Sequence, residues 1–205
     1  MRCYYDGHMV ITVAGFKGGV GKSTTAIHLA GYLSESASVV LVEDDLNESA
    51  LSSSEGLPYP VIKNTELREY ARNNAPEHLI LDTAASSDVD RLQALADECD
   101  LLILPTSPDG LALRALFRTA SALEGYSYKV LLTICPPRHS RDAEDAREML
   151  TANNLPLFQN QIRRAVAFQR AVLEGVLVRD VSDSKAMVAW LDYVRVGDEI
   201  AKEVK

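Results

Sequence analysis

The chain carries the stretch Gly15-Phe16-Lys17-Gly18-Gly19-Val20-Gly21-Lys22-Ser23-Thr24-Thr25 near its start. The apolar run that leads into it, Met9–Gly15, predicts a buried strand, and the residues after it, Ser23–Ser36, have the apolar spacing of a helix. Glycines allow the backbone to bend around an anion and to point N–H groups at it, and a helix N-terminus adds partial positive charge. The order of strand, glycine loop, lysine and helix therefore predicts a phosphate-binding loop.

The residues at the end of this loop have the chemistry that nucleotide phosphates require. Lys22 can reach the β- and γ-phosphates, and the Ser23 hydroxyl can ligate Mg²⁺. The strict G-x-x-x-x-G-K-[ST] pattern needs glycine at position 16, where the chain has Phe16, and it does not use Lys17. The predicted contacts of the loop with the cofactor are Gly18, Gly19, Val20, Gly21, Lys22, Ser23 and Thr24.

Strand-like apolar runs alternate with helical patterns along the rest of the chain. The runs are continuous rather than alternating, which is typical of strands buried on both faces by crossover helices. We therefore predict an α/β fold with one doubly wound, mainly parallel sheet and helices on both faces, as in P-loop NTPases. The 205 residues fit a single domain over 1–205, in which 1–8 is a dispensable N-terminal extension.

The position of Lys17 distinguishes this loop from other phosphate-binding loops. Phe16–Thr24 matches x-K-G-G-x-x-K-[ST]-[ST] at every fixed position, so the chain resembles the ParA/MinD family of deviant Walker A ATPases. Its compact length and the lack of an N-terminal DNA-binding domain are similar to the short ParA type. The resemblance implies ATP and Mg²⁺ as cofactors. It also implies a catalytic, cofactor-binding role for Lys17, which in the family reaches across a face-to-face dimer to the partner's phosphates.

The same resemblance assigns two acidic positions. Glu43–Ser49 occupies the place of the family's D-x-D-x-Q-x-[NS] element, and the best register puts Asp45 on the catalytic aspartate that orients the attacking water. A shift of one residue would give this role to Asp44. The family's Walker B strand is similar to the apolar run that ends in Asp82, which implies that Asp82 and Ser23 contact Mg²⁺.

Two stretches of the C-terminal part also resemble the family. Pro136 and Pro137 stand where the family's adenine-flanking loop begins, which implies nucleotide contact, and a simple turn is the alternative. Ile162–Phe168 is similar to the family's I-x-x-R-x-A-[FY] stretch, in which Arg164 is the matching arginine.

The net charge of −8 at first opposes nucleic-acid binding, but the charge is unevenly distributed. Residues 1–127 carry 9 basic and 18 acidic side chains, whereas residues 128–205 carry 12 and 11. The C-terminal part can therefore form a local basic surface. The candidate contacts with nonspecific double-stranded DNA are Arg138, Arg141, Arg163, Arg164 and Arg170. The alternative is that these arginines pair with nearby acidic residues.

The resemblance implies an ATP-dependent homodimer that binds nonspecific DNA and positions a cargo. A ParB-like or McdB-like adaptor protein would stimulate hydrolysis. The cargo would be a plasmid, a chromosome region or a protein organelle such as a carboxysome, which the family's McdA branch positions. We expect a cytoplasmic protein without membrane contact, since no signal peptide or membrane-length apolar run occurs. With ATP bound it would associate with the nucleoid.

Four other classes of protein share parts of this pattern. A GTPase would need an N-K-x-D motif, which the sequence lacks, and an iron–sulfur reductase would need two cysteines in glycine-rich loops, which Cys99 and Cys135 do not supply. A P-loop metabolic ligase of the dethiobiotin synthetase type stays open as an alternative. A MinD-like membrane switch would end in a basic amphipathic helix, but the tail from Lys185 onward balances four basic with four acidic residues.

Overall fold

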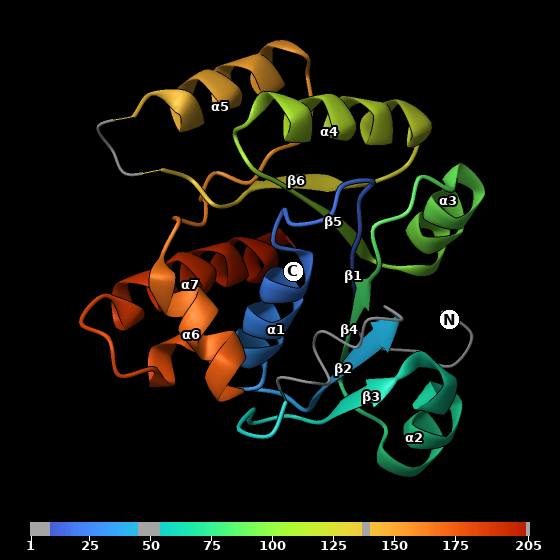
Figure 1. Cartoon of the computed structure of the whole chain (residues 1–205). Helices are drawn as coiled ribbons and strands as arrows, with labels where there is room; N and C mark the ends of the chain where they lie inside the picture. The colour runs from blue at the N-terminus through green and yellow to red at the C-terminus, as the bar shows by residue number, and fades with distance from the viewer. Residues whose placement is uncertain (1–8, 45–53, 137–139, 204–205) are drawn as a thin grey trace.

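The computed structural model describes residues 9–44, 54–136 and 140–203 (Figure 1). Six strands form one sheet in the order β3-β2-β4-β1-β5-β6, and each neighbouring pair is parallel. The strands are β1 (Met9–Val13), β2 (Val39–Asp44), β3 (Val61–Lys63), β4 (His78–Thr83), β5 (Leu101–Thr106) and β6 (Lys129–Leu132). The predicted doubly wound, parallel sheet is confirmed.

Helices cover both faces of this sheet (Figure 1). The α-helices are α1 (Lys22–Leu33), α2 (Leu67–Asn74), α3 (Val89–Glu98), α4 (Gly110–Ala122), α5 (Asp142–Ala152), α6 (Val166–Glu174) and α7 (Ala186–Glu203), and the short 3-10 helices are η3 (Asn64–Glu66) and η4 (Val178–Asp180). Helices α1, α6 and α7 pack on one face, and α2, α3, α4 and α5 pack on the other. Within the described ranges, no helix is long and apolar enough to span a bilayer.

Alternate residues of each strand point to opposite faces of the sheet. In β1, Ile11 and Val13 join the core under α1 and α7, whereas Val10 joins the core under α3 and α4. All three side chains are buried. Burial on both faces explains why the strand sequences are continuous apolar runs.

The carboxyl ends of the strands meet at one edge of the sheet. Val13 pairs with Asp82 of β4 and with Ile103 of β5, so the chain leaves these three strands side by side. From β1 the chain runs toward β2, and from β5 it runs toward β6, in opposite directions along the sheet. Ligands of open parallel sheets bind outside the strand ends at such a reversal.

Helix α1 packs against α7 on the same face of the sheet, and glycine allows a close approach of the two helices. A Cβ added at Gly197 of α7 would lie 2.3 Å from Cδ1 of Tyr32 in α1. The Tyr32 hydroxyl also donates a hydrogen bond of 2.7 Å to Asp198. The first helix after the glycine loop is therefore held by the last helix of the chain.

His28 connects α1 to the segment that follows α6. Its Nδ1 lies 2.7 Å from the carbonyl oxygen of Thr24, and its Nε2 lies 3.0 Å from the backbone nitrogen of Val178. Because the Val178 N–H must donate, the ring proton is assigned to Nδ1. Burial lowers the pKa of His28 to about 4, so the ring is neutral at pH 7. It stacks on Tyr193, whose hydroxyl lies 3.2 Å from that of Thr25.

Candidate nucleotide-binding site

The glycine loop lies between β1 and α1 at the carboxyl edge of the sheet. Gly19 and Gly21 have φ angles of 74° and 87°, in the left-handed region that residues with a Cβ rarely adopt. Gly21 is the N-cap of α1, and its carbonyl accepts a hydrogen bond of 2.9 Å from the N–H of Thr25. A Cβ built on Gly18 or Gly19 meets no heavy atom within 4 Å, so the loop borders open space. This backbone forms a cradle for an anion at the N-terminus of α1.

Thr133, directly after β6, holds the loop against the sheet. Its hydroxyl lies 2.6 Å from the carbonyl oxygen of Val20 and 3.2 Å from that of Thr106. The Val20 contact joins residues 113 positions apart in the sequence. A threonine at the end of an apolar run gives no sign of such a distant partner, and our sequence reasoning missed this contact.

A cavity of about 920 Å³ opens beyond the loop. Its lining is Gly18, Gly19, Gly21, Lys22, Ser23, Thr24, Ala84, Ala85, Thr133, Ile134, Ile162, Arg163, Arg164, Ala165, Phe168, Gln169, Val172 and Tyr193. Among the described residues this lining includes one lysine and two arginines and no Asp or Glu, so its charge favours an anion. The cavity has the size of a small-molecule site, about 300–1,000 Å³. Phosphates suit its cradle, and a base suits its apolar lining at Ile162 and Phe168.

The two lysines of the loop have different contacts. Lys22 is 8% exposed, lines the cavity, and donates a hydrogen bond of 3.1 Å to the Lys17 carbonyl oxygen. The Lys17 ammonium lies 3.0 Å from Oδ1 of Asp109, the N-cap of α4. The Ser107 hydroxyl, the Ala112 N–H and Lys17 together lower the pKa of Asp109 to about 2. Lys17 is therefore bound to the start of α4, away from the cavity lining.

The predicted Mg²⁺ contacts lie near the loop. Ser23 lines the cavity, and Asp82 is fully buried at the end of β4, beside Val13 in the register of the sheet. Within the part of the chain that the structure describes, no group of three or more His, Cys, Asp or Glu is placed to hold a metal ion. Protein-bound Mg²⁺ commonly uses one or two protein groups together with phosphate oxygens, and Ser23 and Asp82 fit that pattern.

The structure describes one of the two candidates for the water-orienting aspartate. Asp44 ends β2, and both of its oxygens have partners: Oδ1 accepts a hydrogen bond of 2.9 Å from Asn64, and Oδ2 pairs with Arg91. Asp45, the preferred candidate, lies outside the described residues. Its role stays a prediction.

The prolines expected near adenine do not line the first cavity among the residues described. Pro136 lines a second cavity, of about 930 Å³, which shares Arg163 and Arg164 with the first. Pro137 lies outside the described residues. The adenine contacts of both prolines stay predictions.

Ile134 lines the first cavity in a place that our sequence reasoning left unassigned. Its φ angle is 53°, in the left-handed region, which is unusual for a β-branched residue. Such strained residues concentrate at functional sites, because the surrounding structure has to hold them. No local sequence pattern predicts the left-handed backbone of Ile134.

Most of the arginines proposed for DNA contact are engaged with acidic residues. The ion pairs are Arg141 with Asp145 (3.8 Å), Arg163 with Asp192 (2.6 Å) and Arg170 with Asp183 (2.8 Å). Arg164 has no ion pair with any described residue, and Arg138 lies outside the described ranges. The alternative prediction, that these arginines pair with nearby acidic residues, therefore holds for three of them, and their positive charge is partly neutralised.

Cys99 and Cys135 are buried, free thiols. Burial raises the pKa of Cys99 to about 11 and that of Cys135 to about 12. The thiolate is the nucleophilic and metal-binding form of cysteine, and at neutral pH both side chains are protonated. They pack as small apolar residues.

The sequence matches a known family over most of its length. The model of the CobQ/CobB/MinD/ParA nucleotide binding domain matches residues 11–178. The maintenance of carboxysome distribution protein A of Gloeobacter kilaueensis is 35% identical over 204 residues, which cover 95% of this chain and 94% of that protein.

Solved structures share the fold. An ATP complex of a McdA variant from Cyanothece superposes with a TM-score of 0.68 at 16% identity and covers 97% of both chains. The septum site-determining protein MinD of Pyrococcus horikoshii, complexed with Mg-ADP, has a TM-score of 0.70 at 18% identity, covering 95% of this chain and 97% of that chain. At these identities the similarity establishes the fold alone.

We predict that Lys22→Ala weakens Mg-ATP binding by at least about 100-fold, because charge-assisted hydrogen bonds dominate phosphate recognition. Isothermal titration calorimetry with ATP and Mg²⁺ measures the effect. Lys202→Ala removes an exposed lysine from the last turn of α7 and is the matched control, which should bind like the wild type. Near-normal affinity of the Lys22 variant would show that the loop is not the phosphate site.

Proposed function

Because the chain belongs to the CobQ/CobB/MinD/ParA family of nucleotide-binding domains, we propose that it is a ParA-type ATPase that forms a homodimer when ATP is bound. The observation that carries this proposal is the glycine loop at the N-terminus of α1. It opens on a cavity of nucleotide size and has one lysine, Lys22, inside and another, Lys17, at its outer edge. Hydrolysis to ADP and phosphate would then separate the subunits.

In the proposed complex the backbone N–H groups of Gly18–Thr24 surround the phosphates of ATP. Lys22 neutralises phosphate charge, and Ser23 and Asp82 hold Mg²⁺, directly or through its waters. The bound Mg²⁺ supplies charge that stabilises the transferred phosphoryl group. The contribution of the protein is to position these groups, and the hydrogen bond from Thr133 to the Val20 carbonyl of the loop supports that role.

We propose that Lys17 crosses to the nucleotide of the partner subunit. In the single chain its ion pair with Asp109 is partly exposed, at 32% for the lysine and 52% for the aspartate. Exposed ion pairs contribute only about 0–1 kcal/mol to stability, so the Lys17 side chain loses little free energy when it leaves Asp109 for a triphosphate. Within the subunit, the proposal requires a rearrangement of the Lys17 side chain at the outer edge of the glycine loop.

We propose that Asp45 orients the attacking water. The contacts of Asp44 support this choice, because Asn64 and Arg91 already occupy both of its carboxylate oxygens. Asp45 is the next residue along the chain.

The cargo is proposed to be a carboxysome, bound through an adaptor protein of the McdB-like class. The support is the 35% identical relative, whose name describes the maintenance of carboxysome distribution. A plasmid or chromosome region with a ParB-like adaptor is the alternative cargo of the same machinery. In either case we propose a cytoplasmic protein that is associated with the nucleoid in its ATP state.

The C-terminal helix gives no support to a membrane switch. A membrane-binding amphipathic helix needs an apolar face that is free to enter the lipid. The apolar face of α7, with Trp190, Tyr193, Val196 and Ile200, is instead buried in the core on the α1 side of the sheet.

We further propose that the ATP dimer binds double-stranded DNA without sequence preference. The second cavity is lined by the basic residues Arg163, Arg164, Arg170, Lys185 and Arg195 and by the acidic residues Asp183 and Asp192. A single subunit therefore offers only a weakly basic surface. A dimer would present two such surfaces at once, and avidity would multiply their affinities.

For Lys17→Ala we expect normal ATP binding but dimerisation at least about tenfold weaker, because each subunit loses its phosphate contact across the interface. Light scattering with a hydrolysis-resistant ATP analogue measures it. Asp109→Asn should dimerise at least as well as the wild type, since asparagine still caps α4 but no longer holds Lys17 by charge. If Lys17→Ala dimerises normally, the lysine is only a surface residue.

For Asp45→Ala we expect bound ATP and a single-turnover hydrolysis rate about 100-fold lower, because the attacking water loses its orientation. Asp44→Ala is the matched control, and it should hydrolyse ATP at a rate close to that of the wild type. The opposite result, a slow Asp44 variant beside an active Asp45 variant, would move the role to Asp44.

For DNA we expect binding with ATP and little with ADP, measured by fluorescence anisotropy on unrelated duplexes across a salt series. Arg164→Ala should lower the slope of log affinity against log salt by about 2, because one phosphate contact is lost in each subunit of the dimer. Arg72→Ala, on α2 at the opposite face of the sheet, is the control and should not change the slope. Equal binding in both nucleotide states would rule out a nucleotide-controlled DNA surface.

A further inference from the structure

The segment Gln159–Ala165, called the wall segment below, separates the two large cavities. Four of its residues, 162–165, line the first cavity opposite the glycine loop. The second cavity is lined by Gln159, Asn160, Gln161 and the shared residues Arg163, Arg164 and Ala165. The wall segment is neither helix nor strand, so its position depends on contacts with the neighbouring elements.

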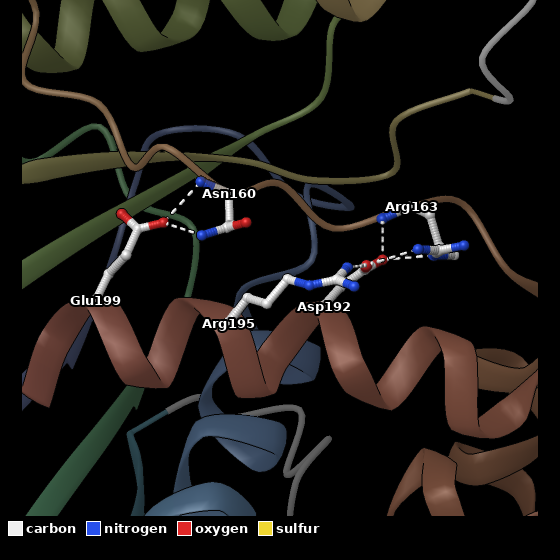
Figure 2. Close-up of polar contacts among 5 residues, drawn as sticks. All are labelled: Asn160, Arg163, Asp192, Arg195 and Glu199. Atoms are coloured by element: carbon white, nitrogen blue, oxygen red, sulfur yellow. Dashed lines mark hydrogen bonds and ion pairs between the residues drawn. The ribbon is translucent and has the colours of Figure 1, made fainter.

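Two carboxylates of α7 hold the wall segment (Figure 2). Asp192 is 4% exposed and binds Arg163 three times: its Oδ2 accepts from the backbone N–H at 3.1 Å and from Nε at 2.6 Å, and its Oδ1 accepts from Nη2 at 2.7 Å. Arg195, one turn further along α7, lies 3.4 Å from the same carboxylate. A bidentate pair of this kind fixes orientation as well as distance.

Glu199 holds the other end of the wall segment. Its carboxylate accepts hydrogen bonds from the backbone N–H of Gln159 at 2.9 Å and from that of Asn160 at 2.7 Å, and the Asn160 side-chain amide also donates to it. Figure 2 shows Glu199 and Asp192 on the same side of α7, both directed at the wall segment. The helix thus satisfies backbone donors that no sheet or helix ladder satisfies.

The inner side of the wall segment is bonded to the end of β6. The N–H of Ile162 donates to Leu132 at 2.8 Å, that of Cys135 donates to Ile162 at 3.0 Å, and that of Arg164 donates to Cys135 at 2.7 Å. Ile134, with its left-handed backbone, lies between these bonded residues. A shift of the wall segment would therefore also displace Ile134 in the lining of the first cavity.

Helix α7 also contacts the phosphate end of the site. Tyr193, next to Asp192, lines the first cavity, and its hydroxyl lies 3.2 Å from that of Thr25 in the first turns of α1. One helix therefore sets the spacing between the glycine loop and the wall segment. In the proposed ATP complex, the phosphates contact the glycine loop, and the ribose and base face the wall segment.

We propose that Asp192 and Glu199 are positioning residues that set the affinity for the nucleoside part of the nucleotide. They act through the wall segment and need not touch the ligand. The inference rests on the proposed ATP site and adds that recognition beyond the phosphates is controlled from α7. It follows that loss of either carboxylate weakens ATP binding and leaves the binding of a bare polyphosphate unchanged.

The test compares Mg-ATP with Mg-tripolyphosphate, which has the phosphates without ribose and base. Calorimetry on the full chain gives both affinities for the wild type, Asp192→Asn, Glu199→Gln and Arg163→Lys, with melting temperatures recorded in parallel. Asp198→Asn removes the same charge from α7 at a position that contacts Tyr32 rather than the wall segment, and is the control.

We expect Asp192→Asn to weaken ATP binding about tenfold, the effect of one charge-assisted contact, with tripolyphosphate affinity within about twofold of the wild type. Glu199→Gln should act in the same direction. The ATP affinity of Arg163→Lys should lie between those of the wild type and Asp192→Asn, because lysine keeps the charge and loses the paired geometry. The control should bind both ligands like the wild type.

Equal loss of affinity for both ligands, or no loss for either, would overturn the inference. Should Asp192→Asn fail to fold, Glu199→Gln decides, since its partners are mainly backbone N–H groups of a partly exposed part of the chain. A wild-type chain that binds neither ligand would overturn the proposed function itself. If instead the wild type binds ATP more tightly than tripolyphosphate, and the α7 variants bind both ligands like the wild type, only the further inference is overturned.

Discussion

A chain that leaves a buried parallel strand must turn into its crossover helix within a few residues, and here it does so around a space for an anion. The turn requires positive φ angles at Gly19 and Gly21, which only glycine adopts without strain. Because Gly21 is also the N-cap of α1, the same turn points the helix N-terminus at the cavity. The position of Lys22, the reach of Ser23 and the exposure of Lys17 all depend on this geometry.

The proposed phosphate cradle is assembled by parts of the chain that are far apart in sequence. Thr133 after β6 holds the loop through the Val20 carbonyl, and His28 and Tyr193 connect α1 to η4 and α7. Helix α7 then holds the wall segment on the other side of the cavity. A small number of buried polar contacts thus relate the two walls of the site, and buried contacts of this kind are rigid because each unpaired group would be costly.

Basic and acidic side chains are also separated by the tertiary structure. The chain is acidic overall, yet the described lining of the first cavity contains only basic titratable groups apart from Tyr193. The acidic partners Asp192 and Asp183 line the second cavity, where they pair with Arg163 and Arg170. Arginine therefore has two uses here, as a structural partner of a carboxylate and as surface charge, and the sequence alone does not separate them.

The sequence by itself determined the elements that rest on local physics. Continuous apolar runs are typical of strands buried on both faces, and the spacing from Lys17 to Thr24 predicts a glycine turn before a helix, so the parallel sheet and the turn into α1 were predicted correctly. Only the tertiary structure brought Thr133 to Val20, Asp109 to Lys17 and Asp192 to Arg163. These pairs are 29 to 113 residues apart, and each depends on how the strands and helices pack against one another. Local sequence patterns do not specify these contacts, because they follow from the packing of the whole fold.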